Sequence, residues 1–276
     1  MHDAEKPEIV LRSQSGWIPV DWRELIATRE LFLTMVLRDI QVRYKQTVLG
    51  VGWAVIQPLA SMIVLAAVFS QLLRGIDTQG VAYPLFVYTG MVPWTFFNNA
   101  VNAAATSAVT QQHLISKIYF PRVYAPTAPV GAALLDMVVA FLLLMLLFPF
   151  YHVTPSWQIV FVPVLMLLTF AAVIGVGLTS AALVILFRDF RYIVVFAVQI
   201  LFYLTPVLIP ATYFKKYAPL LALNPMFGLI DGYRSAIFGI PWNPLLVGIS
   251  AFSAVAVFLI GIYFFRRVER YMADIL

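Results

Sequence analysis

Six long apolar runs constrain this chain more than any other feature of its sequence. A helix needs about 20 mainly apolar residues to cross a bilayer, and each run is near or above that length. The runs must be helical, because an isolated strand in lipid leaves its backbone groups unpaired. We therefore expect an all-α polytopic membrane protein with six transmembrane helices. The runs are Val48–Leu73, Tyr83–Val109, Pro126–Phe150, Trp157–Phe187, Ile193–Ile209 and Leu245–Phe265.

Composition and charge agree with this class. Only 11% of the residues are charged and 62% are hydrophobic, whereas an ordinary soluble domain has about 25% charged residues. With the N-terminus in the cytoplasm, 14 of the 18 lysines and arginines fall on the cytoplasmic side. Positive charge accumulates in cytoplasmic loops, so both termini are expected to be cytoplasmic. We interpret the net charge of +5 as a sign of topology and not as a nucleic-acid surface.

Residues 1–46 are expected to form a cytoplasmic tail and an interfacial helix, ahead of a six-span domain over residues 47–276. Apolar residues between Trp22 and Lys45 recur every three or four positions, which favours an amphipathic helix. Asp21 and Glu24 have the spacing of a capping box at its start. Such a helix lies in the membrane interface. The alternative is a cytoplasmic helix that packs on another domain.

Polar residues inside the spans are candidates for function. The second run contains Asn98, Asn99 and Asn102, which either pack between spans or form a wall of a polar pathway. Asp136 is the only ionisable residue deep in a run. An intramembrane charge indicates function by default, such as a proton relay, and the alternative is a pairing that serves packing.

The segment 210–244, between the fifth and sixth predicted spans, is rich in proline. It is expected on the outer side and is too short to span, so it predicts short re-entrant helices. Asn224 and Pro225 can start one of them. Asp231 and Arg234 have ion-pair spacing within it, and we expect them to pair, or to bind head groups, at an outer gate. A surface helix on the outer leaflet is the alternative.

Signatures of catalysis are missing from the sequence. There is no G-x-x-x-x-G-K-[ST], G-x-S-x-G or H-E-x-x-H motif, and the three histidines lie far apart. A hydrolase or acyltransferase needs a nucleophile and a base within reach of each other. We therefore expect no catalytic residues, no metal site and no cofactor bound by this chain.

Four motifs in order resemble the permeases of type-2 ABC exporters. The similarity is to the branch that exports lipid-linked polysaccharide, which comprises O-antigen, capsule and teichoic acid transporters. It runs from about Arg38 to the C-terminus. The motifs are RDIQVRYKQTVLGVGWAVIQP (38–58), YPLFVYTGMVPWTFF (83–97), LISKIYFPR (114–122) and LNPMFGLIDGYRSAIFG (223–239).

This resemblance implies the membrane subunit of an ATP-driven exporter in a bacterial inner membrane. The implied partners are a second copy of the chain, a separate subunit that binds ATP and magnesium, and a lipid-linked glycan in a channel between the copies. The family also places an interfacial helix before the first span and re-entrant helices before the sixth. The alternatives are a type-2 exporter of a drug or lipid, and a proton-coupled secondary carrier that uses Asp136.

Two further sets of residues are expected to act in transport. The loop between the second and third runs combines apolar and basic side chains, which suits a protein partner. The family resemblance implies that this loop is the coupling helix that contacts the ATPase. The alternative is a loop that dips into the lipid head groups. Aromatic rings can hold sugar C–H faces, by analogy with base stacking. The loop residues are Leu114, Ile115, Lys117, Ile118, Tyr119, Phe120 and Arg122. The aromatic pathway candidates are Trp53, Trp94, Phe97 and Tyr203.

Overall fold

The computed structural model describes residues 22–45, 50, 52–72, 77–112, 120–270 and 272. Within these ranges all regular elements are helices, as the apolar runs predict. They are α1 (Trp22–Ala27), α2 (Arg29–Tyr44), α3 (Gly52–Leu72), α4 (Tyr83–Thr110), α6 (Tyr124–Leu147), η1 (Pro149–Tyr151), η2 (Trp157–Phe161), α7 (Val162–Leu186), α8 (Phe190–Tyr203), η3 (Ala211–Tyr217), α9 (Ala218–Leu221), α10 (Pro225–Phe238) and α11 (Pro244–Glu269).

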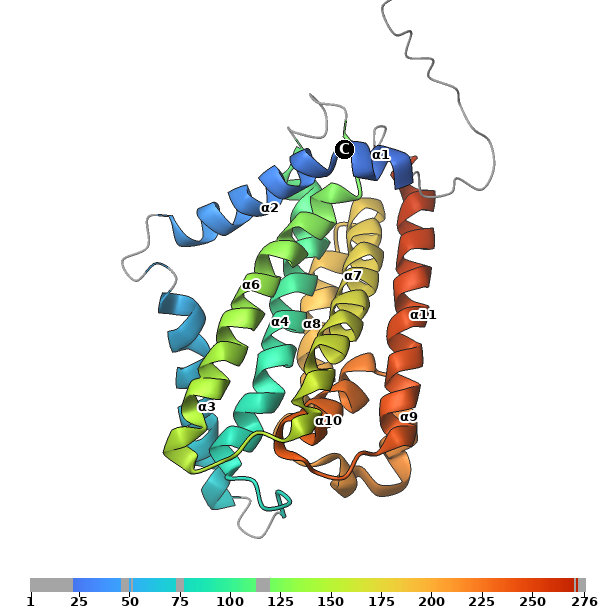
Figure 1. Cartoon of the computed structure of the whole chain (residues 1–276). Helices are drawn as coiled ribbons and strands as arrows, with labels where there is room; N and C mark the ends of the chain where they lie inside the picture. Colours follow the sequence, from blue (N-terminus) through green and yellow to red (C-terminus); the bar gives the residue numbers. More distant parts are fainter. Residues whose placement is uncertain are drawn as a thin grey trace, which may run out of the picture.

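The helix α4 forms the centre of the bundle. It runs beside α6 and α7, and it also contacts α3, α8 and α10 (Figure 1). Most of its length is buried. This position explains how α4 can carry three asparagines in an apolar bundle, because polar side chains at membrane depth are placed against protein or water.

Three helical segments in the described part of the chain are long and apolar enough to cross a membrane. They are Tyr124–Tyr151, Trp157–Leu186 and Pro244–Glu269. Two shorter apolar helices, Val55–Ser70 and Phe190–Tyr203, occupy the first and fifth predicted runs. The second run is α4, whose 28 residues extend for about 42 Å but include amides and small side chains. Each of the six runs contains a helix, but the helix in the fifth run ends at Tyr203, before the run ends at Ile209. Six membrane crossings remain a prediction.

The predicted N-terminal helix is present but broken. A turn at Thr28 separates α1 from α2, where the threonine hydroxyl donates to the Glu24 carbonyl over 2.7 Å. Both helices lie across one end of the bundle, oblique to the long helices (Figure 1). Met35 of α2 is buried against α6, whereas Leu33 and Leu37 are exposed. These exposed leucines are available to the membrane interface that the sequence predicts for this helix.

The helix α10 lies inside the bundle, at the end opposite α1 and α2 (Figure 1). The Asn224 side chain caps its start by accepting from the Met226 amide over 3.1 Å, and Gly239 ends it with a φ of 72°. It contacts α4, α7 and α11, and almost all its residues are buried. A helix lying on the molecular surface, the alternative expected from the sequence, is therefore wrong.

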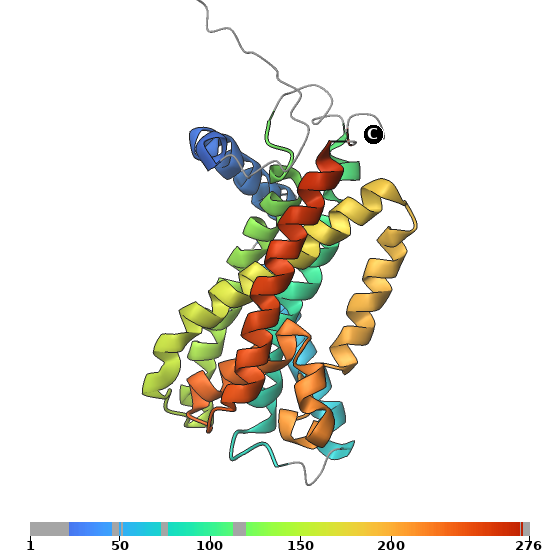
Figure 2. The same ribbon diagram turned by 90° about the vertical axis from the view of Figure 1, so that its right-hand side faces the viewer.

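The helix α8 is attached much more loosely than the others. Figure 2 shows it standing apart from α7 and α11 on one side of the molecule. Val194 and Val198 are its buried residues, and most of its large apolar side chains are exposed. Its free face must contact lipid or another protein, because such a patch is unstable in water.

Two glycines allow α7 and α11 to touch backbone to backbone. A Cβ atom placed on Gly175 would lie 2.4 Å from the Val257 carbonyl oxygen, and one on Gly261 would lie 2.2 Å from the Gly175 carbonyl oxygen. Small residues at helix crossings give membrane helices their close packing. This contact joins the two longest apolar elements of the C-terminal half.

Replacing Gly261 by alanine should destabilise the bundle, since the new methyl group has no space. We expect a loss of about 1–3 kcal/mol in the free energy of unfolding, the usual cost of overpacking. Gly248→Ala is the matched control on the same helix, because a Cβ there meets nothing within 4 Å. Unfolding in detergent micelles measures both. Equal stability of the two variants would contradict the close crossing.

Candidate functional site

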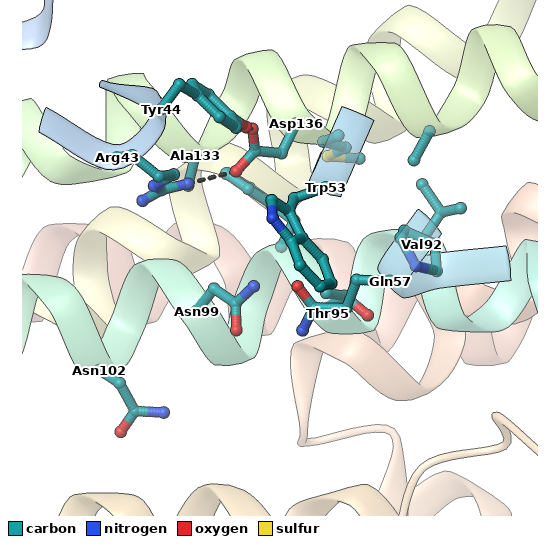
Figure 3. A pocket seen from close by; sticks show the side chains of 14 residues that line it. Arg43, Tyr44, Trp53, Gln57, Val92, Thr95, Asn99, Asn102, Ala133 and Asp136 are labelled. Carbon is teal, nitrogen blue, oxygen red and sulfur yellow. Dashed lines mark hydrogen bonds and ion pairs between the residues drawn. The ribbon is translucent and has the colours of Figure 1, made fainter. Parts of the chain in front are cut away.

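A polar cavity of about 450 Å³ opens between α2, α3, α4 and α6 (Figure 3). We call it the α4 pocket, because α4 supplies much of its polar wall. Pockets of this size are typical of small-molecule sites. Its polar and aromatic lining residues are Arg43, Tyr44, Trp53, Gln57, Thr95, Asn99, Asn102 and Asp136.

Asp136 is held by two side chains from the end of α2. Arg43 donates to one carboxylate oxygen, and the Tyr44 hydroxyl donates to the other (Figure 3). Burial and the neighbouring carboxylate raise the pKa of Tyr44 to about 12, so the phenol keeps its proton and remains a donor. Asp136 therefore has an arginine on another helix as its partner, which is the pairing that the alternative interpretation expects. This arrangement disfavours the proton relay.

Sequence reasoning missed the partners of Asp136, although Arg43 and Tyr44 stand in the first of the recognised motifs. The ion pair joins residues 93 positions apart. It ties the last turn of α2 to the middle of α6.

The amides of α4 form one polar face of the pocket. Thr95, Asn99 and Asn102 are four and three residues apart, so they share a side of the helix. The Asn102 amide donates to the Asn98 carbonyl over 2.8 Å, which fixes its position. Of the two interpretations of these asparagines, the structure favours a pathway wall, because two of them line a cavity.

The four aromatic pathway candidates do not come together. Trp53 lines the α4 pocket and is 48% exposed. Trp94 and Phe97 lie on a different face of α4 and are 5% and 1% exposed, with the Trp94 ring 5.5 Å from the rings of Phe97 and Phe202. Packing against α8 covers both rings and leaves no surface for a sugar. Tyr203 is 77% exposed at the end of α8, away from the pocket-lining residues.

Asp231 and Arg234 form no direct ion pair, although their charges interact at longer range. Arg234 is buried, and its guanidinium donates to the carbonyls of Phe86, Pro206 and Val207. It also stacks at 3.4 Å over the Phe86 ring. Three carbonyls from two elements satisfy this cation better than one carboxylate on its own helix. The absence of a side chain at Gly90 makes room, since a Cβ there would lie 2.7 Å from the guanidinium.

The predicted ATPase-contact loop is only partly described. Leu114, Ile115, Lys117, Ile118 and Tyr119 lie outside the described residues. Phe120 is 5% exposed and packs with Met35 and Tyr124. Arg122 donates to the Glu269 carbonyl at the end of α11 over 2.7 Å. The described end of the loop is therefore connected to α2, α6 and α11.

Removing one partner of the pair between Arg43 and Asp136 should destabilise the protein. Asp136→Asn leaves Arg43 without a counter-charge. We expect the free energy of unfolding to fall by about 1–3 kcal/mol, less than the roughly 3–5 kcal/mol lost when a fully buried pair is broken. Asp39→Asn is the control, because Asp39 pairs with the exposed Arg38 on the same helix; exposed pairs contribute at most about 1 kcal/mol. Unfolding in micelles is the measurement. The double variant Arg43→Met/Asp136→Leu should recover part of the loss, and strict additivity would contradict the pairing.

No group of three histidine, aspartate or glutamate side chains that could hold a metal lies in the described part of the chain. The α4 pocket instead offers hydrogen-bonding side chains and the aromatic rings of Tyr44, Trp53 and Phe96 around a space for a polar molecule. Such a lining can hold or pass a polar molecule, but it lacks a nucleophile and base pair.

Known proteins resemble this chain over nearly its whole length. It is 29% identical to the O-antigen export system permease protein RfbA of Myxococcus xanthus, which covers 92% of this chain and 98% of that protein. RfbA of Klebsiella pneumoniae is 25% identical over 90% of this chain and 95% of its own length. The polysialic acid transport protein KpsM of Escherichia coli is 23% identical over 86% and 93%. The family model described as ABC-2 type transporter matches residues 30–238, so this chain belongs to the ABC-2 type transporter family.

Proposed function

We propose that this chain is the membrane permease subunit of an ATP-driven exporter of polysaccharide. The observation that carries the proposal is the full-length similarity to permeases named for O-antigen export and polysialic acid transport. The chain has no P-loop motif, so ATP and magnesium bind in a separate partner subunit. The names of these relatives favour a glycan over a drug or a lipid as the substrate.

The finer architecture that we propose has six spans, both termini in the cytoplasm and two copies around a channel. The exposed apolar face of α8 supports a second copy, because this helix finds little cover in its own chain. The substrate is a glycan on a lipid carrier, in the inner membrane of a bacterium. Trp53 and the amides of the α4 pocket are the surfaces that we assign to the glycan in this chain.

The orientation can be measured with single cysteines, because the chain has no native cysteine. We expect an impermeant maleimide to label a cysteine at Ser156 in intact cells, since this residue lies in the predicted second outer loop. A cysteine at Asp189, in the loop before α8, should react only after lysis. The reverse pattern would overturn the proposed topology, including the cytoplasmic placement of α1 and α2.

We propose that residues 114–122 contact the ATPase and transmit its motion. Support comes from the end of the loop, where Phe120 packs on α2 and α6 and Arg122 binds the end of α11. A displacement of the loop would reach three elements at once. From α2 it would pass to the middle of α6 through Arg43 and Asp136.

Expression of the chain with its ATPase should restore glycan export to a strain that lacks its own exporter. Tyr119→Ala should reduce copurification of the ATPase or export several-fold, because it removes an aromatic contact. Tyr217→Ala is the control, at an exposed tyrosine in η3. Cell-surface glycan and the copurified ATPase are measured together. Export that resists loss of the ATPase and stops with a proton uncoupler would instead support a secondary carrier.

A further inference from the structure

A second cavity is lined by residues of η3, α9, α10 and the segment that leads into α11. The helices α9 and α10 lie at the end of the molecule opposite α1 and α2 (Figure 1). The cavity volume of about 380 Å³ falls within the range of roughly 300–1,000 Å³ for small-molecule sites. We call the cavity the outer pocket, because the proposed topology places it on the outer side. Among its polar and aromatic residues are Gln79, Lys215, Asp231, Arg234, Trp242 and Asn243.

Asp231 supplies the carboxylate of this pocket. Within the described part of the chain, its oxygens accept no hydrogen bond and form no close ion pair. Its charge interacts with that of Arg234 only at longer range. A carboxylate offers about four lone-pair sites, and a half-buried one is normally satisfied by donors. An acidic side chain that lines a cavity without a hydrogen-bond donor from the protein is therefore available to a ligand that donates hydrogen bonds.

Arg234 lines the same pocket, but carbonyl oxygens of the protein already occupy most of its hydrogen-bond donors. Its guanidinium makes four hydrogen bonds to the carbonyls of Phe86, Pro206 and Val207, out of five N–H groups. It therefore cannot form the two-pronged contact that arginine makes with phosphate. The remaining cation in the lining is Lys215, which is exposed. This distribution of charge favours a donor ligand over an anionic one.

Trp242 gives the pocket a fixed aromatic wall. Its indole N–H donates to the Gln158 amide oxygen over 2.8 Å, and its ring meets Phe161 edge-on at 5.8 Å. These contacts hold the ring plane without using its whole face. An aromatic face that is fixed in advance binds a flat apolar surface with little loss of conformational entropy.

The backbone at the rim is held in a conformation that is rare for its residue type. Lys215 has φ 46° and ψ −125° inside η3. Such conformations are costly for a lysine and cluster at ligand sites. Residues of η3 and of the segment between α10 and α11 both line the pocket.

We propose that the outer pocket binds one hexose unit of the polysaccharide as it leaves the transporter. Asp231 accepts hydrogen bonds from a pair of sugar hydroxyls, and Trp242 contacts the C–H face of the ring. Gln79 and Asn243 supply amide groups at the edge. The glycan identity rests on the proposed function, whereas the binding of a hydroxyl-rich ring rests on the pocket alone.

The test uses the full chain, purified without its ATPase in lipid nanodiscs. Methyl glycosides of glucose, galactose, mannose and N-acetylglucosamine are the probes, and saturation-transfer NMR is the readout. We expect at least one of them to bind, with affinity about tenfold lower in Asp231→Asn and Trp242→Ala. The matched controls are Asp77→Asn and Trp157→Ala, both exposed and outside the pocket lining. Thr212→Trp fills the pocket from an exposed position and should also abolish binding, even if a buried variant fails to fold.

The outcomes separate the two proposals. Absence of binding by every glycoside, or binding that survives both Asp231→Asn and Thr212→Trp, would overturn the outer pocket as a sugar site. Displacement of the glycosides by low concentrations of glycerophosphoethanolamine would assign the pocket to a lipid head group instead. Export of glycan by the wild type with its ATPase, but without glycoside binding, would refute this inference alone. Glycoside binding without any export would refute the proposed function alone.

Discussion

Charged side chains inside an apolar helix bundle must be neutralised by the protein itself, and this requirement organises both ends of the molecule. Lipid offers no partner to Asp136 or Arg234, and each of them binds groups of another element. At one end, Asp136 of α6 is bound by Arg43 and Tyr44 of α2. At the other, Arg234 of α10 is bound by carbonyls from α4 and from the segment after α8. Each of these contacts joins segments that are distant in sequence.

These contacts place the two candidate sites on α4 and on α10. The ion pair of Asp136 forms one wall of the α4 pocket and leaves the amides of α4 free on the other. The carbonyls around Arg234 occupy the guanidinium and thereby leave Asp231 open to the outer pocket. In both pockets a structural interaction occupies one cationic side chain, and the groups left to contact a ligand are neutral or accept hydrogen bonds. Such surfaces suit a hydroxyl-rich polymer, which is recognised by many weak contacts.

The helix α8 is loosely packed, whereas α7 and α11 are tightly packed against each other. This difference in packing indicates which part of such a permease can move. The crossing at Gly175 and Gly261 leaves no space for even a Cβ atom between the two backbones. In contrast, α8 buries only Val194 and Val198 among its residues. In the coupling role that we propose for residues 114–122, motion would enter through Phe120 and Arg122 and would reach α2, α6 and α11 first. The part that can respond with least loss of packing is the loosely attached α8.

The sequence alone indicated the class, the six apolar runs, the family and the start of α10, because these depend on local composition and spacing. Asn224 and Pro225 begin α10 as the sequence predicts. The sequence did not determine which residues contact each other in the fold. The spacing of Asp231 and Arg234 predicted a direct ion pair that does not form. The four aromatic pathway candidates are divided between a pocket, a core and an exposed helix end. Only the tertiary structure decided these points, since a polar group at membrane depth binds the best donor or acceptor in reach, and that partner can lie 148 residues away, as Phe86 does from Arg234.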